Sequence, residues 1–214
     1  GLVDVLVVGM GFMPFTIGLD RWRALGDRYG VPIYPALNTR PIMRMYEERR
    51  KRTSDWRNYI RAAAAWWWHS QTDGVYLFNL FTHEDTNVGR IDRSLVYEPL
   101  REVGDPAALA GKDKLYGIEG SHGMFSQAAE VAALPVALTV HERRLPLNMG
   151  PDADNPKARF RLHAWASGGS SDRKVWMRLN HTLLETEWQG DHYSADVPDG
   201  VMRVGRNELS VFTD

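Results

Sequence analysis

The first half of the chain alternates short apolar runs with amphipathic segments. Residues 19 to 29 and 55 to 71 have the spacing of helices, with Trp22 and Leu25 on the apolar stripe of the first. The apolar runs between and around them are typical of parallel strands buried on both faces. They occupy residues 3 to 9, 31 to 37 and 75 to 81. This alternation predicts a parallel sheet with right-handed helical crossovers.

Capping and packing signals mark the two helices. Gly30 is expected to end the first helix, and Ser54 or Asp55 to cap the second. In the second helix, residues 62 to 65 are alanines that allow close packing on the sheet. The tryptophans at 66 to 68 point about 100° apart, so they cannot all face the core. We favour packing over a sugar-stacking platform for them, because they lie late in the helix and away from the face where barrel sites form.

The second half follows a different pattern. A helix is expected over residues 94 to 103, and Asp105 with Pro106 begins a short helical turn. Gly-rich, irregular sequence follows. Beyond it, short alternating strands separated by Gly-containing turns predict an all-β sandwich. These strands are expected at residues 136 to 141, 158 to 166, 174 to 184, 193 to 198 and 207 to 213.

The glycine pair after the first apolar run resembles a dinucleotide-binding loop only superficially. Such loops need a third glycine, which allows a helix to pack closely and to present its N-terminus to the pyrophosphate. Pro14 occupies that position, beside the bulky Phe15, and the second strand ends at Asn38 without the expected acid. We therefore interpret Gly9 and Gly11 as residues that let the backbone turn at a strand end.

The opening apolar run needs a neighbouring strand on each side if it is buried as its composition indicates. Three parallel strands alone would leave two open edges and a poorly covered sheet. We therefore expect a wedge of a (β/α)8 barrel, with the N-terminal barrel half of the same parent chain missing. The expected organisation is a C-terminal barrel portion over residues 1 to 116, a linker over 117 to 134, and a β-sandwich domain over 135 to 214.

Composition narrows the classes of function. The 214 residues carry a formal net charge of -1, which gives no electrostatic case for a nucleic-acid or anionic-membrane partner. No apolar run reaches the roughly 18 residues of a membrane span. The absence of cysteine excludes disulfides, thiolate metal ligands and a thiol nucleophile. No motif implies a cofactor.

Two stretches resemble a known family. DGVYLFN at residues 73 to 79 and LREVGDPAALAGKDKLY at 100 to 116, with the order of elements around them, are similar to the C-terminal part of bacterial family-10-like glycosyl hydrolases. The resemblance implies that the three strands are barrel strands six to eight, followed by a jelly-roll-like domain. It further implies hydrolysis of O-glycosidic bonds by carboxylate acid/base chemistry, and a periplasmic or extracellular location.

In a barrel, functional groups lie at the carboxyl ends of the strands. Retaining sugar hydrolases of this type place carboxyl groups on strands four and seven, but the expected strand seven ends at Asn38, without an acid. Glu84 and Asp85 after the third strand are the best-placed catalytic candidates; a solvated loop is the alternative. The expected substrate-binding residues, with amide, guanidinium, imidazole or aromatic groups suited to sugars, are Tyr34, Asn38, Arg40, Asn79, Phe81 and His83.

The other clusters of charged residues are best explained as solvated surface segments. Glu47 and Glu48 lie among basic residues that neutralise them. The run from His83 to Asp85 is no zinc motif, since Asn87 stands where a second histidine is needed, so no metal site is predicted. Two hypotheses remain: a fragment of a glycoside hydrolase, or a non-catalytic carbohydrate-binding or interaction protein with a degenerate or incomplete barrel.

Overall fold

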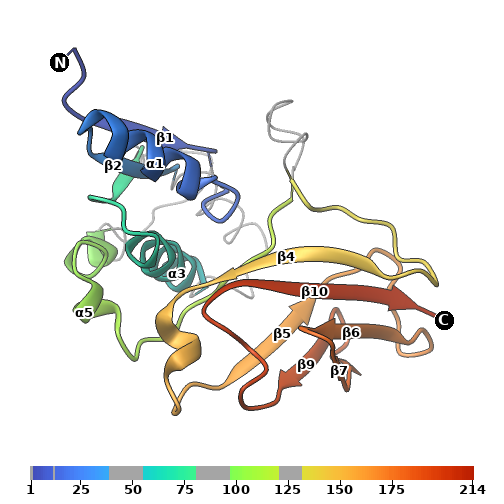
Figure 1. Ribbon diagram of the computed structural model, residues 1–214. Coiled ribbons are helices and arrows are strands. Elements are labelled where there is room, and N and C mark those ends of the chain that lie inside the picture. Colours follow the sequence, from blue (N-terminus) through green and yellow to red (C-terminus); the bar gives the residue numbers. More distant parts are fainter. Residues whose placement is uncertain (1, 12, 39–54, 81–96, 121–131) are drawn as a thin grey trace, which may run out of the picture. The chain divides into compact units, whose positions relative to one another are not determined.

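The computed structural model describes most of the chain (Figure 1). The described residues are 2–11, 13–38, 55–80, 97–120 and 132–214. They form two compact units, Gly1–Glu119 and Gly120–Asp214, which we call unit 1 and unit 2.

Unit 1 contains a parallel sheet of three strands in the order β1-β2-β3. Helices connect the strands, as the alternation of the sequence predicts, and no closed barrel is formed by the described residues. The elements are β1 (Leu6–Gly9), α1 (Leu19–Tyr29), β2 (Ile33–Asn38), α3 (Asp55–His69) and β3 (Tyr76–Phe78). The first strand is shorter than its apolar run, because residues 3 to 5 precede the pairing with β2.

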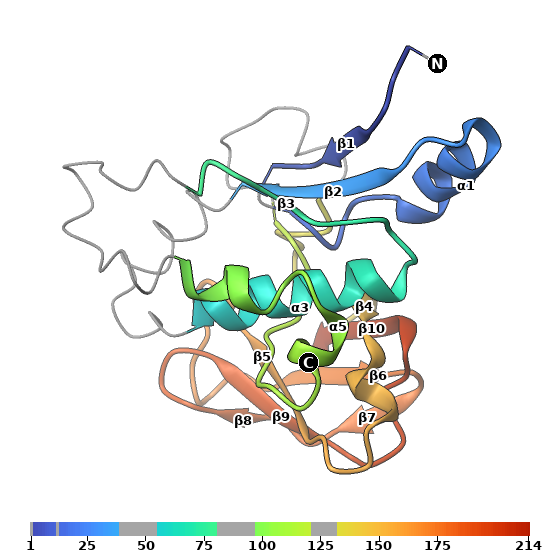
Figure 2. The ribbon, with the colours of Figure 1, turned by 90° about the vertical axis from the view of Figure 1, so that its left-hand side faces the viewer.

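The two faces of this sheet differ in burial. Val8, Ile33 and Leu37 point to one face and are buried. The register pairs Val7 with Tyr34 and Asn38 with Phe78, so these side chains share the opposite face. Consecutive neighbouring strands with right-handed crossovers place every connecting helix on one face. Figure 2 shows α3 along one side of the strands.

Helix α1 spans the predicted residues and ends at Gly30, which adopts the left-handed conformation (φ 64°). The predicted apolar stripe was wrong: Trp22 and Leu25 are exposed, whereas Leu19 and Gly26 are buried. A Cβ on Gly26 would lie 2.7 Å from Ile33 Cγ1. The helix therefore turns its smallest residue towards the strand, which lets the backbones approach closely.

Helix α3 packs through its alanines. All four residues from Ala62 to Ala65 are buried, so the helix is enclosed on every side along this stretch; close packing on the sheet stays a prediction. The three tryptophans point in different directions, as expected. Trp67 is fully buried and donates to the Pro14 carbonyl (3.3 Å), and Trp68 donates to the Val103 carbonyl (2.7 Å). Trp66 Nε1 is buried without a hydrogen-bond partner among the described residues.

The segment after residue 96 contains short helical turns. A 3-10 turn, η1 (Glu98–Arg101), stands where a longer helix over 94 to 103 was expected; residues 94 to 96 lie outside the described part of the chain. The predicted capped turn is confirmed as α5 (Pro106–Leu109), where the Asp105 carboxylate accepts from the Ala107 N–H (2.9 Å).

Unit 2 consists of two antiparallel sheets and a 3-10 turn, η2 (Pro151–Asp154). The four-stranded sheet has the order β4-β10-β6-β7, and the three-stranded sheet has the order β5-β9-β8. The strands are β4 (Arg143–Met149), β5 (Phe160–Ala164), β6 (Val175–Leu179), β7 (Thr182–Leu184), β8 (Glu187–Trp188), β9 (Tyr193–Val197) and β10 (Gly205–Thr213). Strands β4 and β6 of the four-stranded sheet bury alternate residues, as expected for a sheet with one face on a core.

Two strand predictions for unit 2 need correction. Residues 136 to 141 do not form a strand; the first strand is β4, which the sequence reading missed. The expected strand over 174 to 184 is a hairpin, because Asn180 and His181 both adopt positive φ angles (46° and 74°) between β6 and β7. Two such residues form the tight turn that suits the twist of paired strands.

Candidate functional site

The loop between β1 and α1 begins with the glycine pair. A Cβ on Gly9 would lie 3.0 Å from both the Cβ and the carbonyl oxygen of Ala36, so β2 approaches too closely for a side chain there. Gly11 adopts a positive φ (66°), and its carbonyl accepts from the Asn38 N–H (2.8 Å). Gly11 thus turns the backbone and fastens the loop to β2, which confirms the interpretation for this residue, whereas Gly9 is a residue of β1 that allows the close approach of β2. Helix α1 starts only at Leu19, so its N-terminus does not adjoin the pair.

A buried carboxylate, that of Glu119, fastens the same loop. It accepts hydrogen bonds from the Phe15 N–H (2.9 Å), from the Thr16 hydroxyl and from the Tyr59 hydroxyl (2.9 Å). The Phe15 ring packs edge-on against the Tyr59 ring, with centroids 5.4 Å apart. Tyr59 lies in the first turns of α3, so loop, helix and carboxylate meet at the carboxyl end of the sheet.

Burial makes the Glu119 carboxyl group a weaker acid. Glu119 is 8% exposed, and the loss of hydration raises its pKa from 4.5 to about 7, although the hydrogen bonds from Thr16, Phe15 and Tyr59 oppose the rise. A carboxyl group with such a pKa can hold or release a proton near neutral pH, which is the property of a general acid or base. Its three hydrogen bonds also give it a structural role in holding the loop.

Asn38 ends β2 at the same edge. Its Oδ1 atom is buried and accepts no hydrogen bond from the described part of the chain. Buried polar atoms are usually paired, so an acceptor without a partner among the described residues is unusual. The register places Phe78 beside Asn38 on the neighbouring strand. The carboxyl edge of the sheet therefore combines a hydrogen-bond acceptor with an aromatic ring.

The aromatic pair on β3 lies on the sheet face opposite Val8, Ile33 and Leu37. Tyr76 and Phe78 are 43% and 47% exposed, and their rings stack with centroids 6.4 Å apart and an angle of 26°. Residues two apart on a strand share a face, which explains the pairing. The result is a solvent-accessible aromatic surface beside Asn38.

The structure describes only part of the predicted site. Tyr34 lies in the amino half of β2, where its ring packs against Gly74, and thus about 13 Å along the strand from Asn38. Asn79 follows β3 with a positive φ (59°), so the strand alternation does not continue through it. The remaining predicted residues, Arg40, Phe81, His83, Glu84 and Asp85, lie outside the described residues.

Glu119 was missed by the sequence reading. It lies in an irregular stretch that was assigned to a linker, and no periodicity marks it. Its partners Phe15 and Thr16 are more than 100 positions away along the chain, so only the folded structure brings them together.

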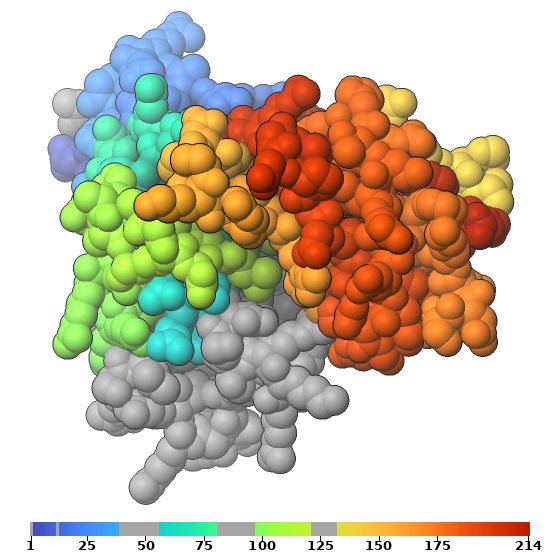
Figure 3. Space-filling model, turned by 90° about the horizontal axis from the view of Figure 1, so that it is seen from below, coloured from blue at the N-terminus to red at the C-terminus, as the bar shows by residue number. Residues whose placement is uncertain are grey.

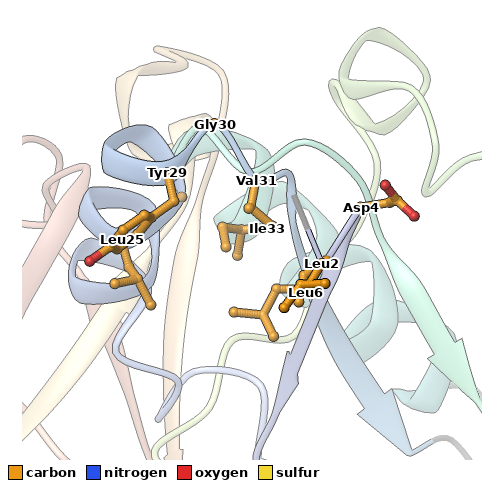
Figure 4. A pocket seen from close by; sticks show the side chains of 10 residues that line it. Leu2, Asp4, Leu6, Leu25, Tyr29, Gly30, Val31 and Ile33 are labelled. Carbon is orange, nitrogen blue, oxygen red and sulfur yellow. The ribbon is translucent and has the colours of Figure 1, made fainter.

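An apolar groove lies at the opposite, amino end of the strands (Figure 4). Its volume is ≈ 560 Å³, and of the described residues that line it Asp4 alone is acidic. The other side chains that line it include Leu2, Leu6, Leu25, Tyr29 and Ile33. Because convergent polar groups are what orient a ligand, this groove is a weaker candidate site than the carboxyl edge.

The structure also bears on metal and membrane sites. Within the described ranges, no three or more His, Asp or Glu side chains are grouped so that they could hold a metal ion. No helix in that same part of the chain has the length and hydrophobicity to cross a bilayer. The chain matches no protein-family model and no curated protein.

Proposed function

We propose that the chain is a carbohydrate-acting protein: the C-terminal portion of a glycoside hydrolase barrel, followed by a jelly-roll-like β-sandwich. The observation that carries this proposal is the parallel sheet of unit 1, in which each strand pairs with the next strand along the chain. Its strands run in sequential order, and the face opposite the buried Val8, Ile33 and Leu37 presents the partly exposed Val7, Tyr76 and Phe78. In a closed (β/α)8 barrel this face is the interior, and further strands of the parent protein flank β1 and β3.

The chemistry of the carboxyl edge supports a sugar ligand. Aromatic rings stack on the apolar faces of pyranose rings, and amide groups bond their hydroxyls. Tyr76 and Phe78 provide the rings, and Asn38 Oδ1 provides an acceptor that a sugar hydroxyl would satisfy. The resemblance of residues 73 to 79 and 100 to 116 to family-10-like glycosyl hydrolases agrees with this class of ligand.

The hydrolase proposal assigns catalysis to Glu84 and Asp85, after β3. Release of reducing sugar from soluble xylan, β-glucan, mannan and starch by the complete parent protein would test it, with Glu84→Gln and Asp85→Asn as variants. We expect the activity to fall at least a hundredfold in one of the two variants, because a general acid or nucleophile is lost. Activity that is unchanged in both variants would refute this assignment.

A non-catalytic carbohydrate-binding protein is the second candidate. It is favoured by the amide of Asn38, which stands at the end of β2 where a hydrolase of this type carries an acid. Affinity electrophoresis in gels containing each polysaccharide separates binding from catalysis. Retardation that is lost in Phe78→Ala but kept in Tyr29→Ala, a matched exposed aromatic on α1, would support a sugar-binding sheet face. Retardation without hydrolysis would select the second candidate.

A further inference from the structure

Glu119 ends a segment that is bonded to α3. The segment runs from η1 through α5 to Glu119 and forms the light-green surface in Figure 3. Within it, the Leu115 N–H donates to the Asn58 carbonyl of α3 (3.0 Å). The Tyr116 ring packs against Phe15 of the β1–α1 loop, with centroids 5.8 Å apart. The backbone that leads to Glu119 is therefore fixed to the helix, and the Glu119 side chain bridges this helix and the loop.

The β1–α1 loop joins Glu119 to the end of β2. The Met13 and Phe15 side chains of this loop are 0% and 5% exposed. Phe15 donates its N–H to Glu119, and nearer the start of the loop the Gly11 carbonyl accepts from the Asn38 N–H (2.8 Å). Close-packed segments shift between discrete arrangements rather than deform continuously. A change at Glu119 is therefore expected to reach Asn38.

The neutral form of Glu119 satisfies the contacts of the cluster. Its Oε1 atom accepts from the Phe15 N–H and the Tyr59 hydroxyl, which suits the carbonyl oxygen of a neutral acid. In that acid the bond between Oε2 and the Thr16 hydroxyl reverses, with Oε2–H donating to Thr16 Oγ1. Of the three residues that contact the carboxyl group, Tyr59 alone is titratable. An ionised Glu119 regains hydration only when the cluster opens, because burial disfavours the charge.

We propose that Glu119 is a positioning residue for the carboxyl edge of the sheet, and that ligand binding at Asn38 and Phe78 weakens when Glu119 loses its proton. This inference rests on the sugar-binding function proposed above. The neutral acid keeps the loop joined to α3, and the Gly11 carbonyl then holds the Asn38 backbone. The register places Phe78 beside Asn38, so a displacement at the end of β2 also reaches this ring. Because coupling between sites is reciprocal, a bound sugar would raise the pKa of Glu119 further.

The amide resonance of Asn38 tests this coupling without any ligand. In the full chain labelled with 15N-asparagine, and assigned with Asn38→Gln, the Asn38 N–H should shift between pH 5.5 and pH 8.5 with a midpoint of about 7. The same resonance in Glu119→Gln should not titrate, because the amide imitates the neutral acid. The Asn155 resonance of unit 2 is the internal control and should lack this transition.

Tyr59→Phe separates control of the proton from a merely structural role. Burial raises the pKa of Glu119, and the hydrogen bond from the Tyr59 hydroxyl opposes this rise. Removal of the hydroxyl should therefore move the midpoint at Asn38 to higher pH, whereas general loosening of the loop would abolish the transition without raising its midpoint. Tyr29→Phe, which alters an exposed tyrosine of α1, is the matched control and should leave the midpoint in place.

Isothermal titration calorimetry with xylohexaose, cellohexaose and mannohexaose tests the effect on binding. For each sugar that binds, the Kd of the wild type should be at least threefold higher at pH 8.5 than at pH 5.5, and the two values should be equal in Glu119→Gln. Equal values in the wild type would overturn the proposal. An Asn38 resonance that does not titrate, or that titrates alike in Glu119→Gln, would also overturn it. Failure of every sugar to bind at both pH values would refute the proposed function instead, while the Asn38 titration would still decide the coupling.

Discussion

Replacing Glu119 by glutamine isolates the effect of one buried charge on unit 1. The amide keeps an oxygen that can accept from the Phe15 N–H and the Tyr59 hydroxyl, and its NH2 group can donate to the Thr16 hydroxyl oxygen. The substitution thus preserves the shape and most hydrogen bonds of the site but removes its titration.

The magnitude follows from the pKa. Burial raises the pKa of Glu119 from 4.5 to about 7, so ionisation of the folded state is disfavoured by about 3 kcal/mol relative to the unfolded chain. Because the folded pKa is the higher one, the stabilising contribution of the protonated group is fully present below pH 4.5 and is lost as the pH rises through about 7. The wild-type loop should therefore weaken between these values, and the glutamine variant should not.

Hydrogen–deuterium exchange of peptides that cover residues 10 to 19 measures this local stability. After correction for intrinsic rates, wild-type protection should fall by roughly one to two orders of magnitude from pH 5 to pH 8. Protection in Glu119→Gln should stay level. Glu208→Gln, an exposed control in β10, should follow the wild type. Wild-type protection that is constant or rises over this range would refute the reasoning.

Three further substitutions test packing and exposure. Gly26→Ala should destabilise unit 1 by about 1–3 kcal/mol in urea unfolding, because its Cβ would meet Ile33 at 2.7 Å; unchanged stability would mean that α1 can shift. Asn207→Ala should lower the stability of unit 2 by about 2–4 kcal/mol. The Asn207 side chain is 1% exposed, accepts a hydrogen bond from the Arg203 N–H and donates to the Arg203 and Gly205 carbonyls, and alanine would leave these buried backbone groups without their partner. The wild-type chain should bind a hydrophobic dye, and Phe78→Ser should reduce the fluorescence, because Val7, Tyr76 and Phe78 expose apolar surface on one sheet face.

Local signals predicted much of unit 1. The helix over residues 19 to 29 was predicted from the glycine that follows it, and the structure confirms this helix. The helical turn after Asp105 was predicted from the capping aspartate and the proline in the first helical position, and it is confirmed as well. The parallel strand order followed from the alternation of strands and helices. These features depend on residues close together in the sequence.

The features that the sequence did not predict depend on packing between residues far apart in the chain. The choice of Gly26 over Trp22 as the buried position of α1 depends on how closely the helix approaches β2. Strand β4 contains alternating buried residues, but Pro146 and neighbouring arginines obscure the pattern. Such a proline is tolerated because, of the strands that the structure describes, β4 pairs with β10 alone.

The candidate site was predicted in part. The carboxyl ends of the strands were the expected location, and Asn38 lies there with a buried acceptor. The cluster around Glu119 could not be derived, since it joins residues from distant parts of the chain.

Footprinting by hydroxyl radicals in the presence of oligosaccharides tests the carbohydrate-facing sheet most directly. The rings of Tyr76 and Phe78 are oxidised readily when exposed, and a bound sugar would shield them. We predict that at least one of the xylo-, gluco- or manno-oligosaccharides lowers oxidation at both residues and leaves Tyr29 unchanged. Equal oxidation of Tyr76 and Phe78 with and without every sugar would contradict the account.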